Sequence, residues 1–134
     1  MIKLSKLSDY AVVVLSLLAR DRAKLMTATG LSSASGIPEP TVAKVLKLLA
    51  KEGVISSTRG MNGGYTLTRD PATISVTELI SALEGPIALT ACVEGSDDNC
   101  GIESICPMSG KWQMVNQTIK TALDGLPLSD LLIP

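Results

Sequence analysis

The hydrophobic period of the chain changes near residue 54, and this change constrains the fold more than any other feature. Before it, residues 38–51 predict an amphipathic helix that opens at a proline, with an apolar stripe on one face and lysines on the other. After it, residues 54–59 and 65–69 predict two strands around a glycine-rich bend, whose Asn-Gly pair is typical of a hairpin. The stripe consists of Val42, Val45, Leu46 and Leu49, and the lysines are Lys44, Lys47 and Lys51.

Further helices are predicted on both sides of this unit. Ser8 and Asp9 can cap a first helix that runs to residue 20, and a short helix over residues 27–35 precedes the lysine helix. A capping box opens another helix over residues 75–84. We therefore expect a mainly α fold with a small β-hairpin wing: a winged helix-turn-helix DNA-binding domain in residues 1–84.

The second half of the chain has a different character. Residues 85–109 show no sustained period and contain all three cysteines, which predicts a loop that serves a function or binds a ligand. Residues 110–134 are expected to form a long dimerisation helix and a tail, and Pro107 resembles the first residue of that helix. An apolar seam at spacings of 3 and 4 includes Trp112, Val115 and Ile119, which are the candidate interface residues of a homodimer. Met108 and Ala122 continue the seam at its two ends.

The charge of the chain is divided unevenly. Residues 1–70 carry ten basic and five acidic side chains, and residues 71–134 carry two basic and eight acidic ones. The basic half with its lysine helix predicts binding to double-stranded DNA. Lysines contact phosphates, residues near the helix N-terminus reach base edges, and an arginine on the wing enters a minor groove. The candidate DNA-binding residues are Thr41, Lys44, Lys47, Lys51 and Arg59, together with the N-terminal Lys3 and Lys6.

The chain contains no histidine, which excludes histidine-based nucleophilic and general-base catalysis and the common zinc sites. We expect no enzyme and no small-molecule substrate. The first apolar run is too short to cross a membrane and lacks the pattern of a signal peptide, so we expect a cytoplasmic protein without membrane contact.

The three cysteines, Cys92, Cys100 and Cys106, are separated by seven and five residues. Spacing alone leaves two interpretations open, a metal or iron–sulfur loop and a set of unrelated or redox-labile thiols. The acidic side chains among them disfavour a thiol switch, because nearby negative charges disfavour the reactive thiolate form. A bound metal cation would reverse this effect.

Four segments together resemble a known family. They are the opening LSKLSDYA of residues 4–11, the wing RGMNGGY of residues 59–65, the helix of residues 75–82 and the three-cysteine loop. In this order they resemble the IscR and NsrR type of winged-helix iron–sulfur transcriptional regulators. The opening segment and the final Cys106-Pro107 are most similar to regulators of the SUF iron–sulfur assembly system.

The resemblance implies a homodimer crossed through the C-terminal helix, with an iron–sulfur cluster held by Cys92, Cys100 and Cys106. NsrR-like members complete a 4Fe-4S site with an aspartate of the opposite subunit, and Asp9 stands at the matching place. IscR instead uses a histidine three residues beyond its last cysteine, where this chain has Ser109. The resemblance therefore favours a 4Fe-4S cluster, with 2Fe-2S as the alternative. Asp9 as a simple helix cap is the competing interpretation.

We predict a transcriptional regulator, in the first place a repressor, that senses iron–sulfur cluster status and controls cluster assembly genes. The alternatives are a nitric-oxide or redox-sensing repressor of the same family, a metal-free thiol-switch repressor, and a winged-helix module that binds other proteins.

Overall fold

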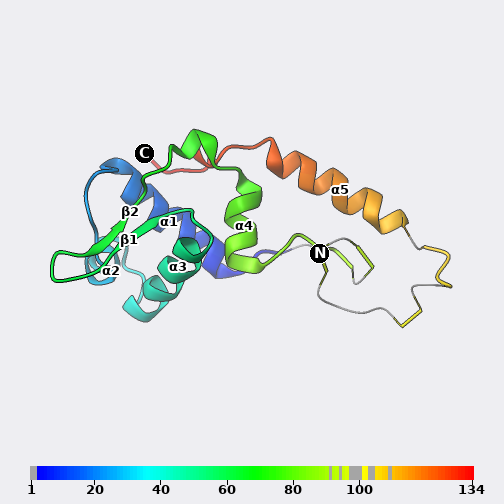
Figure 1. Cartoon of the computed structure of the whole chain (residues 1–134), viewed down its shortest axis with the longest axis horizontal. Helices are drawn as coiled ribbons and strands as arrows, with labels where there is room; N and C mark the ends of the chain where they lie inside the picture. Colours follow the sequence, from blue (N-terminus) through cyan, green and yellow to red (C-terminus); the bar gives the residue numbers. More distant parts are fainter. Residues whose placement is uncertain (1–2, 91, 94, 97–100, 103–104, 109) are drawn as a thin grey trace.

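The computed structural model describes residues 3–90, 92–93, 95–96, 101–102, 105–108 and 110–134, and Figure 1 shows how they are arranged. A winged helix-turn-helix occupies one end, and a last helix extends away from it. This confirms the mainly α fold with a small β wing. The elements are α1 (Lys6–Arg20), α2 (Ala28–Ser35), α3 (Glu39–Lys51), β1 (Ser56–Thr58), β2 (Gly64–Thr66), α4 (Val76–Glu84) and α5 (Lys111–Asp124), with short 3-10 helices at Pro71–Thr73 and Leu128–Asp130.

The apolar stripe of α3 forms the centre of the core. Its four members are at most 1% exposed and pack with buried residues of α1, α2 and α4, whereas the three lysines lie on the exposed face. Burial of an apolar side chain of this size contributes about 1.5–3 kcal/mol. The helical period therefore orients the lysines outward as the sequence predicts.

The wing is an antiparallel hairpin in which Ser56 pairs with Thr66 and Thr58 with Gly64. Both strands are shorter than predicted. On its other edge the wing is joined to the segment before α2, because Tyr65 exchanges two backbone hydrogen bonds, of 2.8 and 3.0 Å, with Met26. A side chain at Gly64 would place its Cβ 2.8 Å from the Met26 carbonyl oxygen, so this close approach requires glycine.

The start of α1 differs from the prediction. The helix begins at Lys6, and Ser5 rather than Ser8 or Asp9 is the N-cap residue, with no hydrogen bond from its own side chain. The interpretation of Asp9 as a helix cap is therefore wrong; Asp9 lies exposed in the first turn.

The last helix begins later than expected. Its N-cap is Gly110, in the left-handed conformation, and Pro107 lies in a turn before it. Pro107 is thus not the first helical residue, and Cys106 does not lie at the positive end of α5. Met108, the expected first member of the apolar seam, also lies outside the helix.

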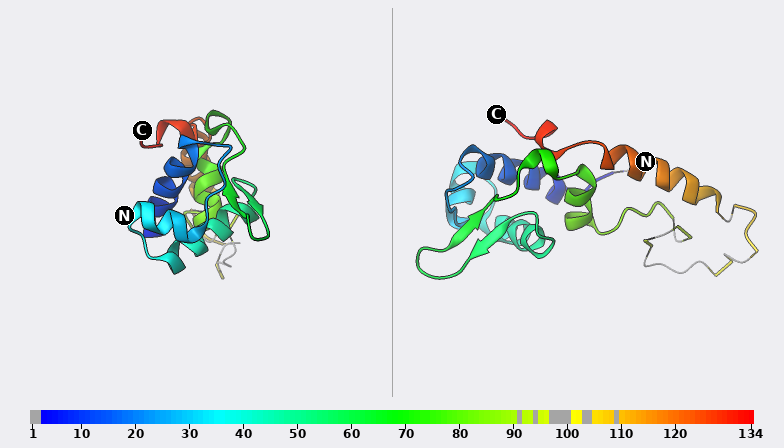
Figure 2. Two further views of the ribbon diagram at one scale, coloured as in Figure 1. Left: turned by 90° about the vertical axis from the view of Figure 1, so that its left-hand side faces the viewer. Right: turned by 45° about the horizontal axis from the view of Figure 1, so that its top comes forward.

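After α5 the chain returns to the winged-helix unit (Figure 2). Leu128 is fully buried in the core, its N–H donates to the Ile74 carbonyl at 2.7 Å, and the Ile133 N–H donates to the Ser16 hydroxyl at 2.9 Å. The tail therefore contributes to the same hydrophobic core as α1, α3 and α4. In the part of the chain that is described, no helix is both long and apolar enough to span a bilayer.

Candidate DNA-binding surface and cysteine loop

The exposed face of α3 presents Lys44, Lys47 and Lys51, and Thr41 is half-buried near its N-terminus. The turn before α3 is well defined: Gly36 adopts φ +79° at the end of α2 and donates its N–H to the Ser32 carbonyl. A hydrogen bond of 2.8 Å from the Thr29 hydroxyl to the Glu39 carboxylate joins α2 to the start of α3. This arrangement is that of a recognition helix held by the helix before it.

The wing carries Arg59, which is exposed, and Met61, which is fully exposed at its tip. Met61 is not among the residues predicted from the sequence, where its place beside the Asn-Gly pair is the available signal. The base of the wing is held by Arg22, whose guanidinium donates to the carbonyls of Leu67 at 3.3 Å and Thr68 at 2.6 Å. Arg22, one of the ten basic residues of the first half, thus stabilises the fold.

Arg69 is also used within the fold, in an ion pair of 3.3 Å with Glu78. The start of α1, which carries Lys6 and follows Lys3, lies at the end of the winged-helix unit opposite the wing (Figures 1 and 2). The structure therefore brings the α3 lysines and Arg59 into one unit and sets Lys3 and Lys6 apart from the wing.

Two of the three cysteines lie in the described residues. Cys92 and Cys106 are free and half-buried, and the Cys92 sulfur lies 3.2 Å from the Thr90 hydroxyl. Cys100 and Ser109 fall outside the described residues. Soft thiolates are the donors that hold iron–sulfur clusters, so the two described thiols fit such a group in kind.

Asp9 has no hydrogen bond or ion pair among the described residues. Asp9, Cys92 and Cys106 do not form a group that could hold a metal ion within the described part of one chain. Asp9 instead borders an apolar groove of about 380 Å³ between α1, α4 and the tail. The apolar side chains of this groove are Leu4, Val12, Val13, Val76, Leu79, Ile80, Leu131 and Ile133.

The apolar seam of α5 forms a second surface. Trp112 and Val115 are each 39% exposed and Ile119 is half-buried, whereas Met114, 70% exposed, lies on the other side of the helix. Exposed apolar side chains that lie together on one helix are typical of a protein–protein interaction surface.

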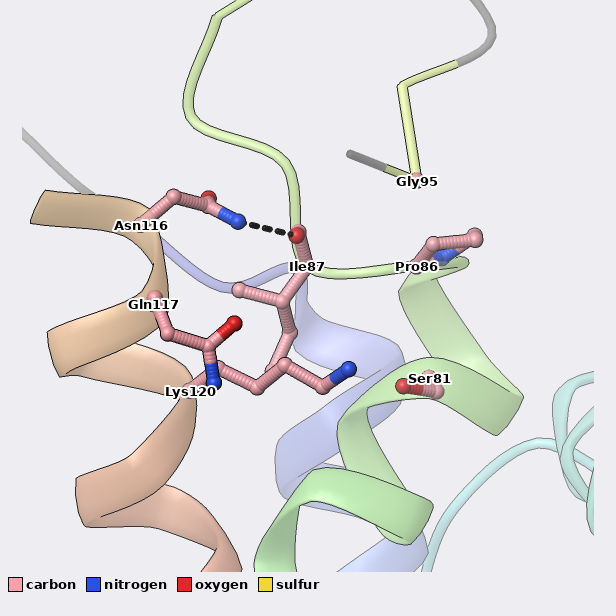
Figure 3. A pocket seen from close by; sticks show the side chains of 7 residues that line it. All are labelled: Ser81, Pro86, Ile87, Gly95, Asn116, Gln117 and Lys120. Atoms are coloured by element: carbon pink, nitrogen blue, oxygen red, sulfur yellow. Dashed lines mark hydrogen bonds between the residues drawn. The ribbon is translucent and has the colours of Figure 1, made fainter. Parts of the chain in front are cut away.

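Beside the seam, one turn after Trp112, α5 contacts the start of the cysteine loop through Asn116. Its side chain accepts a hydrogen bond of 2.9 Å from the Leu89 N–H and donates one of 3.0 Å to the Ile87 carbonyl. Figure 3 shows this contact at the edge of a pocket of about 190 Å³ that Ser81, Gln117 and Lys120 also line. Asn116 is not among the residues predicted from the sequence, where its one signal is a polar side chain beside the apolar seam.

Glu84, the last residue of α4, connects the start of the cysteine loop to α1. Its carboxylate accepts hydrogen bonds of 2.7 Å from the Ser5 N–H and 3.1 Å from the Ser8 hydroxyl. The carboxylate therefore lies at the N-terminus of α1, where the helix dipole favours a negative charge. The hydrogen bonds from Ser5 lower the pKa of Glu84 below its ordinary value of 4.5, burial opposes this shift, and the bond from Ser8 adds to it.

We expect Glu84→Gln to destabilise the protein near neutral pH and to have little effect in acid. Because folding lowers the pKa of this carboxyl, the folded state binds fewer protons there than the unfolded chain. Its stabilisation is therefore complete above its ordinary pKa of 4.5 and is lost as the pH falls below the lowered value. The measurement is the difference in Tm between variant and wild type at about pH 7 and about pH 3. Glu52→Gln, at the exposed C-cap of α3, is the control, and an equal difference at both pH values would contradict the assignment.

Comparison with known proteins identifies the family. The Rrf2 family, described as "Iron-dependent Transcriptional regulator", matches residues 4–133. An rrf2-like HTH-type transcriptional regulator of Rhodobacter capsulatus is 33% identical over 117 residues, covering 84% of this chain and 78% of its own. The HTH-type transcriptional repressor NsrR of Streptomyces coelicolor is 31% identical over 132 residues, covering 97% of this chain and 88% of its own.

Solved structures agree with this relationship. CymR, the global cysteine regulator of B. subtilis, matches 98% of this chain and 96% of its own with a TM-score of 0.68 and 25% identity. T. potens IscR matches 97% of this chain and 85% of its own with a TM-score of 0.63 and 27% identity. The chain therefore belongs to the Rrf2 family and is a DNA-binding transcriptional regulator rather than an enzyme.

Proposed function

We propose that this protein is a cytoplasmic, homodimeric repressor whose binding to an operator depends on an iron–sulfur cluster. The observation that carries the proposal is the placement of two functional units on one chain. The α3 lysines and the wing form a DNA-binding surface, and a loop with free, half-buried thiols joins α4 to α5.

The DNA-binding part of the proposal rests on exposed charge. Lys44, Lys47 and Lys51 project from one face of α3 and contact phosphates, Thr41 and Lys44 read base edges, and Arg59 enters the adjacent minor groove. One such helix makes few phosphate contacts, so stable binding calls for two copies. The half-sites are then about 34–36 Å apart, or a multiple of this distance.

The dimer rests on two apolar surfaces. The exposed seam of α5, with Trp112, Val115 and Ile119, is not buried by its own chain, and the groove beside Asp9 is open. In the proposed dimer the seam packs against a second copy, and the loop of one subunit meets α1 of the other. In this arrangement Asp9 lies beside the cysteine loop of the other subunit, where it can act as a cluster ligand.

In the proposed site, Cys92, Cys100 and Cys106 supply three thiolates, and Asp9 of the opposite subunit supplies a carboxylate to a 4Fe-4S cluster. In such a cluster three irons would be held by thiolates and the fourth by the carboxylate, a hard, exchangeable ligand, which would make the cluster sensitive to iron supply, oxygen or nitric oxide. Loop order then depends on the cluster, and the contact of the loop with α1 sets the spacing of the two α3 helices. Genes of iron–sulfur assembly are the proposed targets.

Anaerobic purification with iron and sulfide analysis tests the cofactor. We expect a brown dimer that contains both elements and binds duplex DNA with a strong salt dependence. A colourless protein without iron that still binds DNA would favour the metal-free thiol regulator. A folded protein with no salt-dependent binding would favour a protein-interaction module.

Lys47→Ala is expected to weaken binding to all duplexes alike. The slope of log K against log salt should become smaller by about 1 for each subunit, because one phosphate contact is lost. Lys120→Ala, which removes the same charge from α5, should leave the slope unchanged. An equal loss in both variants would mean that overall charge, and not the α3 face, governs binding.

A further inference from the structure

Asn116 is the one buried residue of α5, and it is 2% exposed. Both polar atoms of its side-chain amide are paired, and both partners are backbone groups of the loop, the Leu89 N–H and the Ile87 carbonyl. The amide therefore binds two residues that are two positions apart, as a neighbouring strand would. Two such bonds fix both the position and the rotation of the segment.

This contact is close to the candidate ligand in sequence. Residues 87–89 follow the end of α4 directly, and the next residue, Thr90, contacts the Cys92 sulfur at 3.2 Å. Val93, which follows Cys92, is 5% exposed. In the chain, Cys92 thus stands between a hydrogen-bonded segment and a residue with a buried side chain, and its sulfur contacts the Thr90 hydroxyl.

An apolar side chain at position 116 would extend the neighbouring seam and would avoid the cost of burying an amide. A buried polar group that is fully paired defines one geometry, whereas apolar contacts tolerate sliding. The chain therefore has at this position a side chain suited to positioning rather than to packing.

We propose that Asn116 is a positioning residue of the cysteine loop: it holds residues 87–89 on α5 and thereby sets the place of the Cys92 thiolate relative to the dimer helix. The proposal rests on the proposed function, in which Cys92 is a cluster ligand. Because Asn116 lies one residue from the seam residue Val115, it joins the loop to the helix that forms the dimer.

Two variants and a control separate positioning from general stability. Asn116→Ala removes both bonds. Asn116→Asp keeps an acceptor for the Leu89 N–H but has no donor for the Ile87 carbonyl. Gln117→Ala is the control, since Gln117 lines the same pocket on the same helix turn and its amide binds Thr121 instead of the loop.

The first readouts use the metal-free, full-length protein. Hydrogen exchange of the Leu89 amide should be at least tenfold faster in Asn116→Ala than in wild type, with little change in Asn116→Asp. Alkylation of Cys92, measured with Cys100→Ser and Cys106→Ser also present, should be several-fold faster in Asn116→Ala and intermediate in Asn116→Asp. Both rates should stay at the wild-type value in Gln117→Ala, and exchange of the α3 amides should be unchanged in every variant.

The loaded protein gives an independent readout. The cluster of Asn116→Ala should decay several-fold faster in air than that of Gln117→Ala, with an altered visible circular dichroism spectrum. Wild-type rates at Leu89 and Cys92 in Asn116→Ala would overturn the proposal, as would equal acceleration in α3, which would indicate general unfolding. If wild type takes up no cluster, the proposed function fails, while the exchange and alkylation rates still decide whether Asn116 positions the loop.

Discussion

The double substitution Trp112→Glu with Ile119→Glu is expected to convert the dimer to monomers and to abolish measurable operator binding. The two residues are seven positions apart on the same side of α5, and the fold does not fully bury either of them. Burying an unpaired carboxylate in an apolar interface is strongly unfavourable, and the double substitution places two of them in the proposed seam. The winged-helix unit should stay folded, because neither residue belongs to its hydrophobic core.

The measurements are the mass in solution, DNA binding and circular dichroism. A matched control is Met114→Glu with Thr121→Glu, which adds the same charge, with the same spacing, on the opposite side of the helix. Both of these residues are exposed, and this control should remain dimeric and bind DNA. A dimeric Trp112→Glu, Ile119→Glu variant would place the interface elsewhere.

The second large effect concerns the proposed cluster ligands. Cys92→Ser, Cys100→Ser and Cys106→Ser should each abolish the iron–sulfur absorbance, since the chain contains three cysteines and each substitution leaves two thiolates to hold the cluster. Asp9→Ala should leave the cluster able to form but make it decay faster in air. Asp9→Cys should make it more persistent, because a fourth thiolate is a better ligand for iron than a carboxylate.

The controls for Asp9 follow from its position. Since Asp9 is not the N-cap of α1, Asp9→Ala should cost the metal-free protein only the helix-dipole contribution of a first-turn acid, about 0.3–1 kcal/mol. Asp124→Ala removes another exposed carboxylate and should leave cluster decay unchanged. Wild-type persistence in Asp9→Ala would remove Asp9 from the ligand set and leave water, Ser109 or an added thiol as the fourth ligand.

Several elements follow from the sequence because their causes are local. The apolar stripe and lysine face of α3 occur where the helical period predicts them, and α2 ends at Gly36. The capping box of Ser75 and Glu78 forms with both of its hydrogen bonds. In each case the residues that stabilise the element lie within a few positions of one another, so a short window of sequence contains the whole interaction.

Besides the strand lengths, the predictions that failed concern ends of helices. The sequence placed caps at Ser8 and Asp9, but the N-terminus of α1 is bound by Glu84, which lies 79 positions from Ser5. Pro107 suggested the start of α5, yet the helix begins only after Gly110. A residue type that is typical of an N-cap shows only that its side chain is able to form the capping hydrogen bond. Contacts with distant residues decide at which position the helix begins.

The candidate site divides in the same way. The lysines and Arg59 were selected from residue type and spacing, because their chemistry is a property of the side chains themselves, whereas the cysteines were selected as cluster ligands through the resemblance of their loop to a known family. Asn116, Glu84 and the structural use of Arg22 became visible only in the tertiary structure. Their partners are backbone or side-chain groups far away in the chain, and a local pattern carries no information about which polar groups meet once the core has formed. The sequence by itself thus determined the elements and the chemistry they carry, whereas the packing of distant segments decided how the cysteine loop is attached to α1 and α5.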